Sequence, residues 1–140
     1  MKLFRAIAVS LSVAILMIAA VAAEAKNKSP FQGRWAGIDG DGSNLTMSFR
    51  AQNTSNNTVF QVTGADDAAF CYLGPCQKAQ MAAVGVLENG NAVHVQAVWW
   101  AENTVDPLAY FVDDSLTYDA STDTLTDNGG IVYHRSSGDD

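Results

Sequence analysis

The sequence contains two histidines, His94 and His134, the residue type best suited to acid-base chemistry near neutral pH. A histidine needs a nucleophile, a carboxylate or a metal beside it to catalyse hydrolysis or proton transfer, and the carboxylates available to these two are Glu102, Asp106 and Asp113. The sequence contains no Gly-x-Ser-x-Gly and no His-Glu-x-x-His motif. We therefore assign no catalytic residue, and a small hydrolase or isomerase that uses a histidine is the least favoured interpretation.

Two pairs of adjacent carboxylates, Asp66-Asp67 and Asp113-Asp114, are the next candidates for acid-base chemistry. Neighbouring residues of a strand point to opposite faces, so neither pair can act together on one substrate without a bulge or a turn. We interpret all four as solvated loop charges.

The segment DGDGSN places Asp39, Asp41 and Ser43 at alternate positions, as in a calcium-binding loop. The sixth position is Asn44, where such a loop needs glycine, and the twelfth is Arg50, where it needs a bidentate glutamate. A tight connection between strands explains the same residues. We predict no metal site and no cofactor, and a weak cation site of another geometry is the alternative.

Cys71 and Cys76 are the two cysteines of the chain, and they lie in the segment CYLGPC. An even number of cysteines in an exported protein predicts a disulfide, which would hold the intervening turn in shape. A redox pair is the alternative, but catalytic pairs have two intervening residues at the start of a helix, whereas here there are four.

The segment Ala92–Trp100 alternates an apolar and a mixed set of side chains. The apolar set is Val93, Val95, Ala97 and Trp99, and the mixed set contains His94, Gln96 and Trp100. The apolar set makes the better core, which would leave the mixed set on the surface. In the opposite register, His94 and Gln96 would point into a pocket and orient a ligand.

Large aromatic side chains are the other candidates for binding, because they could line a hydrophobic pocket. The alternative is that they fill the core, as large aromatic residues usually do in a small domain. The candidate ligand-binding residues are Trp35, His94, Gln96, Trp100 and Tyr110.

Residues 1–25 have the pattern of an export signal. Lys2 and Arg5 precede the apolar run Ala6–Ala23, and Ala23-Glu24-Ala25 is a small-x-small cleavage site. A retained membrane anchor is the alternative, although the run is short for a span. We expect a secreted or periplasmic protein in which residues 26–140 form a single domain with mobile ends.

The composition is acidic, with 8 Lys and Arg against 15 Asp and Glu and a net charge of −7. Cleavage would remove Lys2 and Arg5 and leave the domain more acidic still. Nucleic acid is therefore excluded as an electrostatic partner, and no stable membrane insertion is expected after cleavage. A cationic partner or a small neutral ligand remains compatible with this charge.

Apolar and polar side chains alternate with a period of two residues after the export signal. This pattern is typical of strands with one buried and one solvent-exposed face. The predicted strands are Gly33–Ile38, Leu45–Phe49, Thr58–Thr63, Met81–Leu87, Ala92–Trp100, Ala109–Val112, Ser115–Tyr118, Thr124–Thr126 and Ile131–Arg135. The best helical candidate is the short segment Ala65–Phe70. Successive hairpins without covering helices predict an all-β fold, a small antiparallel up-and-down β-barrel of about eight strands, with a β-sandwich as the alternative.

The first predicted strand contains Gly33-Arg34-Trp35, and the chain closes on Tyr133-His134-Arg135. This combination resembles the calycin group of lipocalins and avidin-like proteins. The resemblance implies that Arg135 packs across Trp35 and closes one end of the barrel, with Gly33 as a structural residue. The closing hairpins are also similar to those of small exported bacterial proteins of unknown function.

The sequence and the resemblance together favour an exported, non-enzymatic binding protein for a small apolar or aromatic ligand. An envelope protein that binds or inhibits another protein through its loops and an acidic rim is the alternative.

Overall fold

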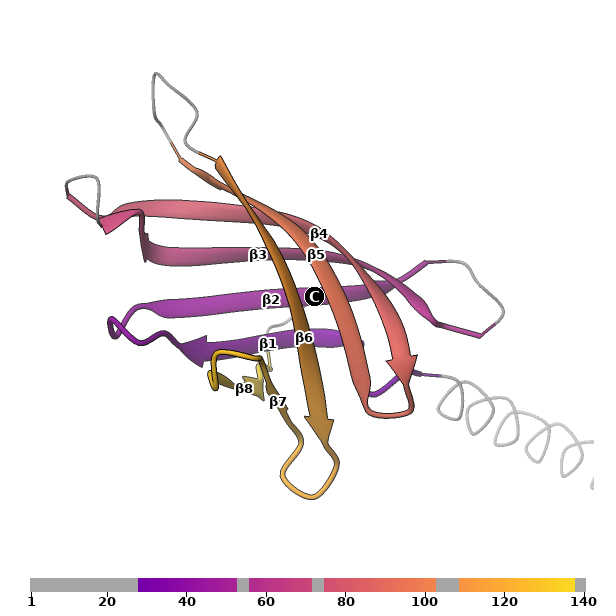
Figure 1. Cartoon of the computed structure of the whole chain (residues 1–140). Helices are drawn as coiled ribbons and strands as arrows, with labels where there is room; N and C mark the ends of the chain where they lie inside the picture. Colours follow the sequence, from indigo (N-terminus) through magenta and orange to yellow (C-terminus); the bar gives the residue numbers. More distant parts are fainter. Residues whose placement is uncertain (1–27, 53–55, 72–74, 103–108, 138–140) are drawn as a thin grey trace, which may run out of the picture.

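The structure is a computed structural model that describes residues 28–52, 56–71, 75–102 and 109–137. The described residues form eight strands, which follow one another in sequence order around a closed barrel (Figure 1). The strands are β1 (Gly33–Ile38), β2 (Asn44–Ala51), β3 (Val59–Ala69), β4 (Gln77–Asn89), β5 (Ala92–Ala101), β6 (Ala109–Asp119), β7 (Thr124–Thr126) and β8 (Val132–Arg135).

Every pair of neighbouring strands is antiparallel, and β8 returns to pair with β1. The predicted antiparallel up-and-down barrel is therefore confirmed. The proposed signal segment, residues 1–25, lies outside the described residues. No helix within the described ranges has the length and apolar character required to cross a membrane.

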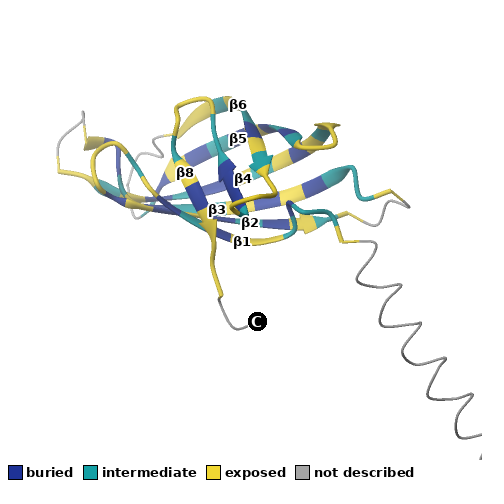
Figure 2. Cartoon of the chain, turned by 90° about the horizontal axis from the view of Figure 1, so that it is seen from below, coloured by how far each residue is buried: buried dark blue, intermediate teal, exposed yellow. Residues whose placement is uncertain are grey.

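Burial alternates along the strands, as Figure 2 shows, because successive side chains point into and out of the barrel. In β2 the inward set is Leu45, Met47 and Phe49, each buried, as predicted. In β5 it is Val93, Val95, Ala97 and Trp99, so the first of the two registers considered for this strand is the one observed. Each fully buried large apolar side chain contributes about 1.5–3 kcal/mol to folding.

Two segments differ from the sequence-based expectation. Ala65–Phe70 is not a helix, because β3 continues to Ala69 and pairs with β4, with a register shift between Asp66 and Ala69. The predicted strands Ala109–Val112 and Ser115–Tyr118 are one continuous strand, β6. The nine predicted strands therefore correspond to eight.

One end of the barrel is sealed by aromatic side chains from the beginnings and ends of strands. Phe31 and Trp35 are fully buried there, and the Trp35 indole Nε1 donates a hydrogen bond of 2.8 Å to the Phe31 carbonyl. The Phe31 ring contacts the rings of Phe49, Phe60 and Tyr118, with centroids 6.0–6.4 Å apart. These contacts fill the barrel at this end.

Arg135, the last residue of β8, covers this end from outside. Its guanidinium donates to the carbonyl of Gln32 at 2.8 Å and to that of Pro30 at 2.9 Å. It also donates to both carboxylate oxygens of Asp123, in the β6–β7 turn, at 2.8 and 2.9 Å. We call this the sealed end. The opposite end, where the odd-numbered strands finish, is the open end.

Candidate functional site

The barrel interior contains a cavity of about 160 Å³ at the open end. Its walls come from six of the eight strands and from the turns that follow β1 and β7. Most of the wall is apolar and is made by Met47, Met81, Val95, Ala97, Trp99 and Val112. Small and flexible side chains such as Ala97, Val95 and Met81 are part of this lining, whereas the rings of Phe31, Phe49 and Phe60 fill the sealed end.

Two aromatic side chains on β5 and β6 form one side of the cavity. The rings of Trp99 and Tyr110 are stacked, with centroids 6.5 Å apart and an interplanar angle of 11°. Phe70, which follows β3, packs edge-on against Tyr110 at 5.2 Å. Tyr110 is 38% exposed, so this wall extends from the interior to the solvent.

Four carboxylates also line the cavity, and each comes from a different element. Asp39 follows β1, Asp66 lies in β3, Asp114 lies in β6 and Asp127 follows β7. Asp66 is buried, with 6% of its surface exposed, and the other three are half-buried. The site therefore combines an apolar wall with a group of negative charges.

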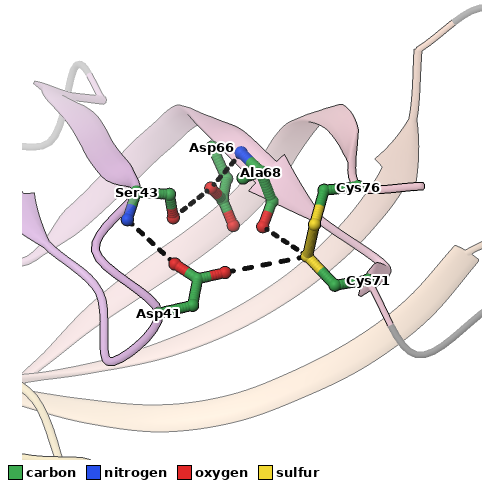
Figure 3. Close-up of a disulfide and its surroundings, with 6 residues drawn as sticks. All are labelled: Asp41, Ser43, Asp66, Ala68, Cys71 and Cys76. Atoms are coloured by element: carbon green, nitrogen blue, oxygen red, sulfur yellow. Dashed lines mark hydrogen bonds between the residues drawn. A yellow bond between two sulfur atoms is a disulfide. The ribbon is translucent and has the colours of Figure 1, made fainter. Parts of the chain in front are cut away.

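Asp66 joins the β1–β2 turn to the end of β3 (Figure 3). Its Oδ1 accepts a hydrogen bond from Ser43 Oγ at 2.9 Å and another from the Ala68 amide at 2.9 Å. Asp41 accepts a bond from the Ser43 amide at 2.8 Å, and hydrogen bonding from Ser43 holds the Asp41 pKa below its usual value. The second Asp41 oxygen lies 3.8 Å from Cys71 Sγ. These contacts fix the rim of the cavity.

Tyr133 of β8 is buried among the remaining carboxylates. Its hydroxyl donates a hydrogen bond of 3.0 Å to Asp127 Oδ2. Burial raises the Tyr133 pKa well above its usual value, and the negative charges of Asp127, Asp114 and Asp39 raise it further. The electrostatic potential in this part of the barrel is therefore negative.

The structure separates the candidate ligand-binding residues taken from the sequence. Tyr110 lines the cavity, whereas Trp35 is buried at the sealed end. His94, Gln96 and Trp100 lie on the outer face of β5, because the alternate residues of that strand are buried. Of these five, the structure brings only Tyr110 to the interior cavity.

The outer wall carries a polar cluster around His94. Its Nε2 lies 3.0 Å from Asp113 Oδ1, and its Nδ1 lies 3.3 Å from Ser115 Oγ and 3.8 Å from Glu88 Oε1. The cluster lies on the outer face of β4–β6, away from the interior cavity. Of the other carboxylates considered beside the histidines, Glu102 accepts a hydrogen bond from Gln80, and Asp106 lies outside the described residues.

Two hollows on the outer surface are larger than the interior cavity. One, of about 360 Å³, lies on the outer face of β1–β4, and its lining includes Arg34, Thr46, Thr63 and Gln80. The other, of about 510 Å³, lies beside the β1–β8 pair and includes Ile38 and His134. The interior cavity is the better candidate site, because inward side chains from several strands line it and combine an apolar wall with converging polar groups.

Cys71 and Cys76 form a disulfide, as predicted, between β3 and β4. In the calcium-like segment, Asp39 lines the cavity whereas Asp41 accepts hydrogen bonds from Ser43. No three His, Cys, Asp or Glu side chains within the described parts of the chain are arranged to hold a metal ion.

The interpretation of the paired aspartates as solvated loop charges is wrong. Both pairs lie within strands, and each divides between the two faces of the wall. Asp66 and Asp114 line the cavity, whereas Asp67 and Asp113 are exposed. The alternation of inward and outward side chains could have revealed this arrangement. Asp66 continues the inward set of β3, and Asp114 continues the inward set of β6.

No family model, curated protein or solved structure gives a significant match to this chain. The architecture is that of a closed eight-stranded antiparallel barrel, and its function must be argued from the site itself.

Proposed function

We propose that this protein is an exported binding protein that holds one small molecule with an aromatic or apolar body in the open end of its barrel. The observation that carries the proposal is the interior cavity of about 160 Å³, which is walled by apolar side chains and by the stacked rings of Trp99 and Tyr110. An eight-stranded barrel is wide enough to be filled by side chains or to hold one small ligand.

The volume sets the size of the ligand. Pockets for drug-sized molecules begin at about 300 Å³, well above this cavity. An engineered protein cavity of about 150 Å³ takes up benzene. The ligand therefore has one ring or a short chain.

Export is supported by the disulfide. Cys71 and Cys76 are bonded, which is consistent with an oxidising compartment such as the periplasm or the extracellular space. Residues 1–25 would supply the signal that directs the chain there.

The proposal is tested by filling the cavity. Ala97 points inward from β5 and lines the cavity, so Ala97→Phe would place a ring in it. Gln96→Phe is the matched control, because Gln96 is the outward neighbour on the same strand. NMR titration with benzylamine and benzyl alcohol should shift the Trp99 indole signal in the wild type and in the control, and not in Ala97→Phe. Absence of any shift in the wild type with either compound would refute the proposal.

A protein-binding function is the second candidate, and one observation favours it. Phe111 is 85% exposed near the start of β6, opposite Val98 of β5 and on the same outer face as the partly exposed Trp100. Large exposed aromatic side chains are enriched at protein interfaces. The exposed Asp113, two residues along β6 on the same outer face, would favour a cationic rim on the partner.

This candidate is tested by cross-linking in the native compartment. A photoreactive phenylalanine analogue at position 111 should give a discrete adduct that weakens at high salt, whereas the same analogue at the exposed position 63 of β3 should not. Equal labelling at both positions, or none, would refute it.

A further inference from the structure

We propose that the ligand is an organic cation, in which an ammonium group is attached to a small aromatic or apolar body. Its ammonium group would lie among Asp39, Asp66, Asp114 and Asp127, and its body against Trp99. This inference rests on the proposed function, because it identifies the charge of the molecule that the cavity holds.

The cavity lining is strongly unbalanced in charge. It contains four aspartates and no lysine, arginine or histidine. Carboxylates are rarely left together in a partly desolvated space, because their mutual repulsion and their loss of hydration both oppose folding. A cation in the cavity would remove this imbalance.

The burial of the Asp66 carboxylate is the strongest single observation in favour of a cationic ligand. It is almost fully buried, and its hydrogen bonds come from neutral donors, the Ser43 hydroxyl and the Ala68 amide. Within the described part of the chain, the nearby cation Lys78 pairs instead with the exposed neighbour Asp67, at 3.6 Å. A buried carboxylate is stable when an opposite charge accompanies it, and the cavity provides the space for one.

The other three carboxylates line the cavity together with Tyr133, whose hydroxyl donates a hydrogen bond to Asp127. The negative charge of each of the three raises the pKa of this tyrosine, in keeping with their places along the same cavity. They come from the β1–β2 turn, from β6 and from the turn after β7, so the negative charge is distributed around the wall. A distributed charge suits an ammonium group, which can accept several partners.

The aromatic wall fits the same ligand. A cation within about 6 Å of an indole or phenol ring is attracted to its face, and tryptophan is the best of these rings. The inward position of Trp99, beside Tyr110, allows this contact together with apolar packing of the ligand body.

Three probes of matched size separate charge from shape. Benzylamine is a cation at pH 7, benzyl alcohol is its neutral equivalent, and benzoate is an anion. Calorimetric and NMR titrations should show benzylamine binding at least about tenfold more tightly than benzyl alcohol, with no detectable binding of benzoate. The preference for benzylamine should decrease as salt is added.

The adjacent aspartates supply matched variants. Asp114→Asn removes an inward charge, and Asp113→Asn removes the outward charge of the next residue on β6. Asp114→Asn should weaken benzylamine binding about tenfold and leave benzyl alcohol unchanged, whereas Asp113→Asn should change neither. On β3, Asp66→Asn and its outward control Asp67→Asn should show the same contrast as the two β6 variants. Thermal unfolding is recorded to verify that each variant folds.

The outcomes distinguish the two proposals. If benzyl alcohol binds as tightly as benzylamine, or if Asp113→Asn weakens benzylamine as much as Asp114→Asn does, the cation inference is overturned and the cavity remains a ligand site. If neither probe binds in the wild type, the proposed function itself fails. If Asp66→Asn does not fold, the comparison of Asp114 with Asp113 decides the question.

Discussion

The guanidinium of Arg135 lies over the indole ring of Trp35, with 4.1 Å between its Cζ atom and the ring centroid. The two residues are also paired across β1 and β8, so the contact joins the first and last strands. Gly33 allows this approach, because a Cβ atom there would lie 3.1 Å from Arg135 Nη1 and the residue has a φ of +124°. This is the packing that the calycin resemblance implies.

Replacement of Arg135 tests the contribution of this seal to stability. Arg135→Ala should lower the free energy of unfolding by about 2 kcal/mol, because it removes the cation–π contact and the donors to Pro30 and Gln32. Arg135→Lys should restore only part of this loss, since an ammonium group lacks the planar fork. The exposed Arg50 provides a control, and Arg50→Ala should change stability by less than about 0.5 kcal/mol in urea unfolding.

Acid sensitivity should depend on Asp123. Its pKa is lowered, chiefly because Arg135 donates hydrogen bonds to the carboxylate. A lowered folded-state pKa stabilises the protein above the unfolded value of about 4, and this stabilisation is lost as pH falls through the folded-state pKa. Asp123→Asn should therefore lose less stability than the wild type between about pH 4 and pH 2 in denaturant titrations. Asparagine tolerates the φ of 51° at this position, and parallel pH curves would contradict the prediction.

Gly37 should be intolerant of a side chain. A Cβ atom there would lie 2.8 Å from Cδ1 of Tyr133 and 3.0 Å from the Val132 carbonyl. Gly37→Ala should displace the tyrosine ring, weaken its hydrogen bond to Asp127 and cost about 1–3 kcal/mol. Gly40→Ala is the control, because a Cβ atom there meets nothing within 4 Å. Similar melting temperatures for the two variants would show that the ring moves freely.

The disulfide should stabilise the open end of the barrel. Replacing Cys71 and Cys76 with serine should lower the free energy of unfolding by about 2 kcal/mol, the value expected for so short a loop. Because Phe70 precedes Cys71 and packs on Tyr110, the fluorescence and NMR signals of the neighbouring Trp99 should change as well. A loss of stability without any change at Trp99 would separate the disulfide from the cavity.

The sequence predicts the barrel well because apolar and polar side chains alternate clearly along its strands. The inward sets of β2 and β5, and the hairpins between strands, follow from that pattern alone. The continuation of β3 through Asp66 and of β6 through Asp113 and Asp114 was missed, since local propensity treats aspartate as a loop residue. Pairing with the neighbouring strands, β4 for Asp66 and β5 for the other two, overrides that propensity.

The candidate site was harder to predict for the same reason. Tyr110 was identified by its type, but the four carboxylates come from parts of the chain that meet only when the barrel closes. Gln96 and Trp100 were attractive as polar and aromatic groups, and a shift of one residue in register would have placed them inside. Which face is inward was predictable from Val93 and Val95, whereas the size of the space between distant strands was not.

The bond between Arg135 and the Pro30 carbonyl brings the two ends of the described chain together at the sealed end of the barrel. A tether attached beside Pro30 or beside Arg135, whether a lipid, a fusion partner or a solid support, would therefore hold the described barrel by its sealed end. The cavity mouth would face away from the attachment point, and immobilised protein should keep full access to molecules in the surrounding fluid.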